Sequence, residues 1–156
     1  MTNTYTQLFV QFVFTVNCES CFIKEEFREE LERVICGIIS EHKSKTYAIY
    51  CNPDHVHILV SINPSMSTSK LIEQIKSGSS KWLNNKKYLP TKFSWQDGYG
   101  AFSYSKSHTK NVVDYILNQP EHHKKQSFQE EYLLLLEKFE VEHNEKFLFK
   151  WFDKKQ

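Results

Sequence analysis

Two short apolar segments separated by only three residues constrain the fold of this chain most strongly. The segments KTYAIYC (residues 45–51) and HVHILVSI (residues 55–62) are rich in β-branched and aromatic residues, as strands are. Asn52, Pro53 and Asp54 lie between them, and each of these residue types favours a turn. The sequence therefore predicts two consecutive strands joined by a tight connection.

The segments around this pair alternate between strand and helix periodicity. In chain order they predict a strand at 6–16, a helix at 24–40, the strand pair, a second helix around 71–82, a strand or hairpin at 93–105, and further helices at 107–119 and 127–142. The first six elements follow the order βαββαβ, which is typical of a ferredoxin-like antiparallel sheet with helices on one face. We therefore expect an α+β fold of this class, followed by C-terminal helices.

Size and composition narrow the class of protein. At 156 residues the chain has the length of one domain, and we expect residues 1–156 to form it. No apolar run approaches the ~20 residues of a membrane helix, and the polar residues 1–7 do not resemble a signal peptide. We therefore expect a cytoplasmic protein with no membrane partner. Its cysteines are expected to be reduced, because only Cys18 and Cys21 form a close pair.

Charge is distributed unevenly along the chain. Residues 67–125 contain ten lysines and four acidic residues, a net charge of +6, whereas the rest of the chain carries a net charge of −5. A basic central region between acidic ends is consistent with a nucleic-acid surface. Lysine-rich faces are also common on proteins that bind no polyanion, so charge alone leaves this function open.

Two histidines in the second strand are the first candidates for chemistry. His55 and His57 are separated by one residue, so on a strand their side chains point the same way, about 6.6 Å apart along it. They can therefore bind one metal ion, with Val56 facing the core. The alternative is that both imidazoles lie on a solvated face. Two nitrogens make an incomplete metal site, so a third ligand must come from elsewhere in the chain.

The helix predicted at 107–119 offers a ligand and a nucleophile. Tyr115 and Gln119 are four residues apart, which brings their side chains to one helix face. Gln119 could add an amide oxygen to the two imidazoles, and such a ligand set with open positions suits Mn²⁺ or Mg²⁺. A metal beside Tyr115 could stabilise the charge that develops when its phenol attacks a phosphate. Taken separately, Tyr115 could equally be a core residue and Gln119 a helix end.

Together these motifs resemble a known family. The stretch NPDHVHILV, followed about sixty residues later by YILNQ, resembles the small single-tyrosine HUH transposases of bacterial insertion sequences. The HUH motif matches His55-Val56-His57, and the tyrosine and glutamine of the catalytic helix match Tyr115 and Gln119. The resemblance covers residues 6–139 and includes relatives associated with repetitive extragenic palindromes.

The resemblance implies a metal-dependent enzyme that acts on single-stranded DNA. Tyr115 would attack a phosphodiester, forming a 5′-phosphotyrosine link and releasing a 3′-OH that later attacks another such link. Members of the family act as homodimers on hairpin-forming DNA ends, and the tyrosine helix can complete the site of the partner subunit. In this interpretation the C-terminal helices carry the catalytic tyrosine.

The same interpretation predicts where DNA would bind. Lysines near the second and third helices could neutralise phosphates, and aromatic residues before the third helix could stack on unpaired bases: Lys70, Lys76, Lys81, Lys106, Lys110 and Trp95. His122 and His123, just past Pro120, are predicted to be surface residues and not ligands.

Two other functions are compatible with parts of the pattern. The chain could be a domesticated single-strand DNA-binding or regulatory protein that keeps the fold without transposing. It could also be an unrelated metallohydrolase that uses the H-x-H pair, although it lacks the further Asp and His ligands that such enzymes need. His55, His57, Tyr115 and Gln119 are all present, which favours the transposase.

Overall fold

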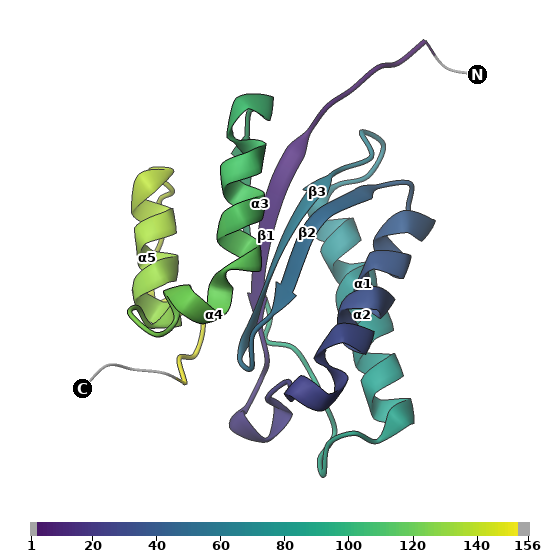
Figure 1. Cartoon of the computed structure of the whole chain (residues 1–156), viewed down its shortest axis with the longest axis vertical. Helices are drawn as coiled ribbons and strands as arrows, with labels where there is room; N and C mark the ends of the chain where they lie inside the picture. Colours follow the sequence, from purple (N-terminus) through teal and green to yellow (C-terminus); the bar gives the residue numbers. More distant parts are fainter. Residues whose placement is uncertain (1–2, 153–156) are drawn as a thin grey trace.

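The computed structural model describes residues 3–152, which contain one four-stranded sheet (Figure 1). Its strands are β1 (Phe9–Thr15), β2 (Lys45–Cys51), β3 (His55–Ser61) and β4 (Gly100–Tyr104). They lie in the order β2-β3-β1-β4, and each neighbouring pair is antiparallel. The predicted ferredoxin-like α+β fold is confirmed.

Strand β3 is buried because strands flank it on both sides. Its His57 lies opposite Val13 of β1 and opposite Tyr50 of β2. Side chains alternate along a strand, so Val56 packs into the core on one face while His55 and His57 lie on the other. The strand therefore holds the two imidazoles on a rigid, flanked support.

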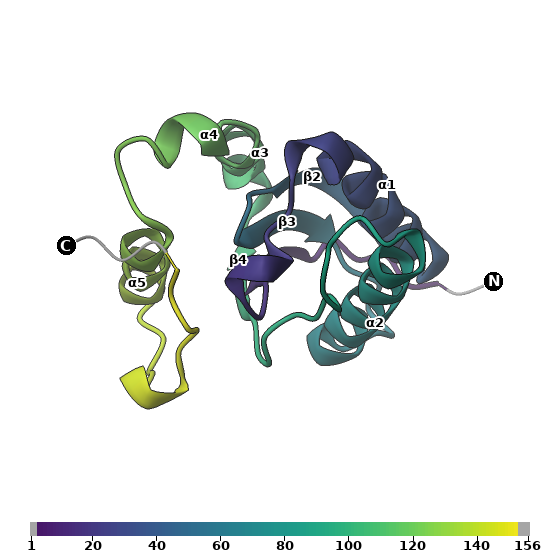
Figure 2. The ribbon, with the colours of Figure 1, turned by 90° about the horizontal axis from the view of Figure 1, so that it is seen from below.

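Helices α1 (Glu25–Glu41) and α2 (Thr68–Lys86) cover one face of the sheet (Figure 1 and Figure 2). Both present apolar residues at helical spacing, and these pack into the larger core with Val56. At the start of α2, the Ser67 side chain accepts a hydrogen bond from the backbone N of Lys70 at 3.1 Å, which caps the helix.

Helices α3 (Thr109–Leu117), α4 (Gln119–His122) and α5 (Phe128–Lys138) lie on the opposite face (Figure 1 and Figure 2). Val112 and Ile116 of α3 pack against Leu59 of β3. Phe128 of α5 packs with Val13 of β1. Both faces of the sheet are thus covered, and the histidine face lies under α3 and α5.

The predicted helix 107–119 is interrupted. A 3-10 turn, η2 (Lys106–His108), precedes α3, which ends at Leu117, and α4 begins two residues later. Pro120 lacks an N–H, so it cannot donate to the carbonyl of Ile116, and its ring would clash with that carbonyl in a continuous helix. It occupies the first turn of α4, where a proline is tolerated. Tyr115 and Gln119 therefore lie on two helices, not on one.

The aromatic C-terminal segment packs on the body of the protein. Beyond η3 (Glu145–Phe147), the Phe149 ring lies 4.9 Å from that of Tyr132 on α5. The Phe152 ring lies 5.4 Å from Phe22, next to η1 (Glu19–Cys21). Within residues 3–152, no helix has the length and apolar character needed to span a bilayer.

Candidate functional site

His55 and His57 lie next to each other on β3 and are almost completely buried. Their ring centroids are 5.1 Å apart, and their exposed fractions are 1% and 0%. The interpretation that they lie on a solvated face is therefore wrong. Two buried imidazoles need polar partners, and those partners define the site.

The Nδ1 atom of each histidine is held by a neighbouring side chain. Nδ1 of His55 lies 2.7 Å from Oδ1 of Asp54, and Nδ1 of His57 lies 2.9 Å from Nε2 of Gln11. The Tyr104 hydroxyl donates to Oε1 of Gln11 at 2.7 Å, which fixes the orientation of that amide. With the Nδ1 atoms engaged, both Nε2 atoms face the same space, as in metal sites where an outer partner orients the ligand.

Glu131 of α5 occupies that space. Its Oε1 lies 2.8 Å from Nε2 of His57 and 3.4 Å from Nε2 of both His55 and His123. One ligand atom from each of these four residues lies within 4.8 Å of the other three. Three imidazole nitrogens and one carboxylate oxygen at such separations form a group that can bind a metal ion.

His123 is a member of this group, contrary to the prediction that it lies on the surface. Its side chain is 18% exposed, and its ring centroid lies 4.7 Å from that of His55. The Nδ1 atom of His123 lies 3.0 Å from the backbone oxygen of Gln126, while its Nε2 lies 2.9 Å from Oε1 of Gln119. The turn of α4 after Pro120 directs the ring inward.

Tyr115 and Gln119 meet the histidine pair through the same carboxylate. The Tyr115 hydroxyl donates a hydrogen bond to Oε2 of Glu131. Nε2 of Gln119 donates to the same oxygen at 3.1 Å. Oε1 of Gln119 accepts a hydrogen bond from Nδ2 of Asn52 at 3.0 Å. The four residues predicted from the sequence thus converge on Glu131: His55, His57, Tyr115 and Gln119. In this arrangement the Gln119 amide forms hydrogen bonds to side chains and does not face a metal position directly.

Burial and charge oppose each other in the cluster. Burial would raise the pKa of Glu131, but the imidazoles, that of His57 foremost, hold this pKa far below its ordinary value. Burial would lower the pKa of His55, but Asp54 and Glu131 raise it to about 9. For Tyr115, burial and Glu131 act together and raise the pKa of the phenol. At neutral pH the cluster therefore contains an ionised carboxylate, a protonated His55 and a neutral phenol.

Sequence reasoning missed Glu131, although a signal was present. In the segment SFQEEYLLLLEKFE it shares helical spacing with Phe128, Tyr132 and Leu135. It therefore stands within the apolar stripe that packs on the sheet, and its exposed fraction is 2%. A carboxylate on the buried stripe of an amphipathic helix needs a partner inside the protein.

The residues predicted to contact DNA do not form one surface. Lys70, Lys76 and Lys81 lie on α2, which covers the sheet face opposite to Tyr115, whereas Lys106 and Lys110 lie at the start of the α3 region (Figure 1). Two of the α2 lysines interact within the chain: Lys70 with Glu73 at 3.7 Å, and Lys76 Nζ with the carbonyls of Gln96 and Gly98 at 2.7 and 2.6 Å.

Trp95 belongs to the core and not to an exposed stacking surface. It is 8% exposed, and its ring centroid lies 4.8 Å from both Phe14 and Phe93. Its indole N–H donates to Oγ of Ser79 at 2.9 Å. With its faces packed and its N–H satisfied, Trp95 offers no free surface for a base.

Several solved structures resemble this chain, and two of them are described here. One is a presumed transposase from Deinococcus radiodurans R1, with a TM-score of 0.59 at 16% sequence identity, covering 76% of this chain and 95% of that one. The other is a tyrosine transposase associated with REP sequences, in a complex with a REP hairpin. Its TM-score is 0.56 at 16% identity, covering 79% of this chain and 73% of that one. Both share the fold.

Sequence comparison assigns the family. No curated protein matches this chain. The family model described as "Transposase IS200 like" matches residues 4–119, which include β1 to β4, α3 and the two histidines. Glu131 and His123 lie beyond the matched residues, so this part of the site belongs to the C-terminal segment. This chain is a member of the IS200-like transposase family.

Proposed function

We propose that this protein cleaves and rejoins single-stranded DNA at hairpin-containing ends, through a 5′-phosphotyrosine intermediate and with a divalent cation. Membership of a transposase family supports the reaction class. The observation that carries the proposal is the shared carboxylate: Glu131 accepts from the Tyr115 hydroxyl with one oxygen and contacts His57 with the other. The candidate nucleophile therefore hydrogen-bonds to a carboxylate that is itself part of the candidate metal group.

The donor set at this group fits a divalent cation. His55, His57, His123 and Glu131 offer three nitrogens and one oxygen within 4.8 Å of one another. Imidazole ligands favour transition metals, whereas Mg²⁺ prefers oxygen, so of the two predicted cations the set favours Mn²⁺. When bound, the cation would polarise a phosphate oxygen and offset the negative charge of Glu131.

In this proposal Gln119 orients members of the metal group and does not bind the metal itself. Its amide nitrogen donates to Glu131 at 3.1 Å, and its amide oxygen lies 2.9 Å from Nε2 of His123. It therefore links two members of the group and fixes their orientation. Its predicted role as a metal ligand would require these bonds to break.

The proposed reaction forms one phosphoester bond for each one that it breaks. Oη of Tyr115 attacks the scissile phosphorus, so that a Tyr115–phosphorus bond forms and the bond from phosphorus to the 3′ oxygen breaks. The phenolic proton is lost to solvent, and the leaving 3′ oxygen takes up one proton from solvent to become the 3′-OH. The reverse attack by the 3′-OH of another strand releases Tyr115 and joins the two strands. Burial and Glu131 raise the pKa of Tyr115, so the resting phenol stays protonated until substrate and cation are in place.

The proposed substrate is single-stranded DNA that folds into hairpins. The REP-associated neighbour was solved with a REP hairpin, and this chain shares its fold. Lys106 and Lys110 lie on the same side of the sheet as Tyr115, so they are better placed than the α2 lysines to contact the phosphates near the cleaved bond. The homodimer that the resemblance implies stays a prediction.

A covalent-adduct assay tests the proposal. The protein is incubated with Mn²⁺ and a labelled pool of single-stranded oligonucleotides that contain a hairpin beside a random segment, and then run on a denaturing gel. We expect a protein–DNA adduct that disappears with Tyr115→Phe and with EDTA. An adduct that persists in Tyr115→Phe would show that another residue is the nucleophile. DNA binding without any adduct would instead favour the domesticated DNA-binding protein.

A further inference from the structure

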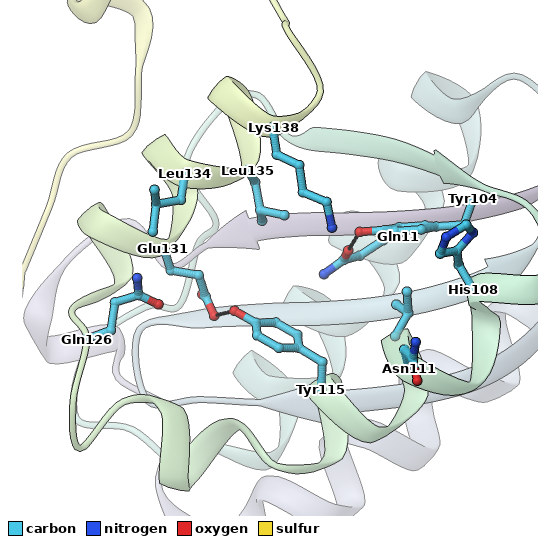
Figure 3. A pocket seen from close by; sticks show the side chains of 11 residues that line it. Gln11, Tyr104, His108, Asn111, Tyr115, Gln126, Glu131, Leu134, Leu135 and Lys138 are labelled. Carbon is cyan, nitrogen blue, oxygen red and sulfur yellow. Dashed lines mark hydrogen bonds between the residues drawn. The ribbon is translucent and has the colours of Figure 1, made fainter.

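A cleft of about 410 Å³ opens directly beside Tyr115, between α3 and α5 (Figure 3). Gln11 of β1 and Tyr104 of β4 line it from the sheet. The contact between Tyr115 and Glu131 borders it. Ligand pockets in proteins range from about 300 to 1,000 Å³, so this volume suits one small unit and not a folded segment.

Two helix faces form the walls of the cleft. Asn111 and Tyr115 lie four residues apart on α3, so they share one face. Glu131, Leu135 and Lys138 lie at helical spacing on α5 and also share a face (Figure 3). The seven-residue step from Glu131 to Lys138 corresponds to about 10 Å along α5. The cleft is therefore a short channel that has the nucleophile at one end and an ammonium group at the other.

The interior combines apolar walls with unengaged amides. Val112, Leu134 and Leu135 provide the apolar surface, and Leu134 is 53% exposed although it is a large apolar residue. Within residues 3–152, no hydrogen bond engages the side-chain amides of Asn111 and Gln126. An amide offers both a donor and an acceptor in one plane, which is what the edge of a nucleobase can pair with.

The charges around the cleft suit a nucleotide. Lys138 forms no ion pair within the described part of the chain, and in Figure 3 its side chain extends from α5 toward Gln11 and Tyr104. Among the residues that the structure describes, Glu131 is the only carboxylate that lines the cleft, and it is engaged by Tyr115, Gln119 and the histidines. A phosphate thus meets a cation at one end of the cleft and no unpaired carboxylate.

We propose that this cleft binds the base of one deoxynucleotide next to the scissile phosphate, holding the base between α3 and α5 with the Asn111 amide at its polar edge (Figure 3). The inference rests on the proposed function, because a strand attacked by Tyr115 must bring a flanking nucleotide to this place. The α5 wall lies outside the family-matched residues 4–119. In this proposal the preference for a flanking base depends on residues of α5 as well as on residues inside that range.

Mononucleotide titrations test the cleft without requiring catalysis. The metal-free protein is titrated with dAMP, dGMP, dCMP and TMP, and with deoxyribose 5-phosphate as the control, while side-chain amide signals are followed by NMR. We expect the Asn111 signal to shift saturably with at least one nucleotide and not with deoxyribose 5-phosphate. An equal shift with the sugar phosphate, or no shift with any nucleotide, would overturn the proposal.

Two matched variants locate the binding. Asn111→Trp places a large side chain in the cleft and should weaken nucleotide binding at least fivefold. Leu117→Trp adds the same side chain on the same helix at an exposed position outside the cleft, and should leave binding unchanged. A smaller variant, Leu134→Ala, should weaken binding about twofold if Asn111→Trp does not fold. Unchanged affinity in the variants that fold would overturn the proposal.

The adduct assay separates this inference from the proposed function. Sequencing of the DNA joined to Tyr115 should show a preferred base beside the attached phosphate, reduced at least threefold by Asn111→Trp or Leu134→Ala and retained in Leu117→Trp. Adducts without any adjacent base preference would overturn the cleft proposal while the reaction stands. Nucleotide binding without any adduct would support the cleft and contradict the proposed function.

Discussion

Glu131 is the residue on which the candidate site depends. Its two carboxylate oxygens contact Tyr115, Gln119 and three imidazoles, and its exposed fraction is 2%. A buried carboxylate is costly unless it is paired, and here the histidines provide the pairing. The oxygens that face these histidines can also bind a cation. Loss of the carboxylate charge should therefore weaken metal binding more than it destabilises the fold.

We expect Glu131→Gln to weaken Mn²⁺ binding at least tenfold, because it replaces an anionic ligand by a neutral amide of similar shape. Calorimetric titration of the metal-free protein with Mn²⁺ measures this directly and requires no DNA. Glu137→Gln makes the same change at an exposed position of α5 and should leave the affinity unchanged. Equal affinities for the wild type and Glu131→Gln would remove Glu131 from the metal group.

His55 predicts a pH dependence for the metal-free protein. Its pKa is about 9 in the folded chain, because Asp54 and Glu131 outweigh burial, against an ordinary value of 6.5. A pKa raised by folding stabilises the folded state fully below pH 6.5, and this contribution is lost as the pH rises through 9. The difference of 2.5 units between 9 and 6.5 corresponds to between about 3 and 4 kcal/mol.

Thermal unfolding in EDTA between pH 6 and 9.5 checks that dependence. Over this range the wild type should lose stability relative to His55→Gln, because the variant lacks the titrating group. A wild-type stability that is constant or rises over the same range, with a parallel curve for His55→Gln, would contradict the prediction.

At the scale of elements, α5 brings Glu131 to the site, so the stability of its first turn matters. Ser127 and Glu130 form a capping box there, in which the Ser127 side chain accepts from the backbone N of Glu130 at 3.2 Å. Ser127→Ala should lower the free energy of unfolding by about 1 kcal/mol. It should also weaken Mn²⁺ binding, because the fraying turn is adjacent to Glu131.

Ser67→Ala is the matched control for this prediction. Ser67 caps α2 in the same way but lies on the other face of the sheet, remote from the metal group. Denaturant unfolding should show a similar loss of stability in both variants, whereas calorimetry should show weaker Mn²⁺ binding only in Ser127→Ala. Equal Mn²⁺ affinities in the two variants would mean that α5 does not need its cap to hold Glu131.

Local patterns predicted the elements well where a single physical signal dominated. The Asn52-Pro53-Asp54 turn and the apolar segments beside it fixed the β2–β3 pair, and helical spacing fixed α1, α2 and α5. The segment 107–119 was predicted as one helix because its periodicity continues to Gln119. Pro120 has no N–H and cannot continue the hydrogen bonds of α3, so α3 ends at Leu117 and α4 begins at Gln119.

The candidate site was predictable only where its residues share an element. His55 and His57 lie on one strand and Tyr115 lies four residues before Gln119, so spacing alone grouped each pair. Glu131 approaches from another helix, and its position depends on how α5 packs across the sheet, which periodicity does not specify. His123 was misread for the same reason, since the direction of its ring depends on the turn of α4.

At the scale of the whole molecule, the sheet separates the larger apolar core on one face from the candidate functional site on the other. Helices α1 and α2 bury one face with the larger apolar core, while α3, α4 and α5 bring the polar site to the other face (Figure 1). One chain thus supplies the histidines, the carboxylate and the tyrosine. This bears on whether Tyr115 acts in its own subunit, because the resemblance allows the tyrosine helix to complete the site of a partner.

Helix α3 is bound to its own sheet by packing as well as by the Glu131 contact. Val112 and Ile116 are buried against Leu59. Beyond the end of α3, Gln119 accepts a hydrogen bond at 3.0 Å from Asn52, which precedes β3. Tyr115 could reach another subunit only if this apolar contact broke and re-formed there. We therefore predict that Tyr115 acts on DNA bound by the histidines of its own chain, whatever the oligomeric state.

Mixing two inactive variants decides between the two arrangements. Tyr115→Phe keeps the metal group and lacks the nucleophile, whereas His57→Ala keeps the nucleophile and disrupts the metal group. If Tyr115 acts within its own chain, then co-folded mixtures form no more DNA adduct than either variant alone, because no subunit contains both parts. If the helix is exchanged between subunits, some sites combine the intact histidines of one chain with Tyr115 of the other. Adduct formation that returns on mixing would therefore contradict the single-chain site and require α3 to leave the sheet on which it packs.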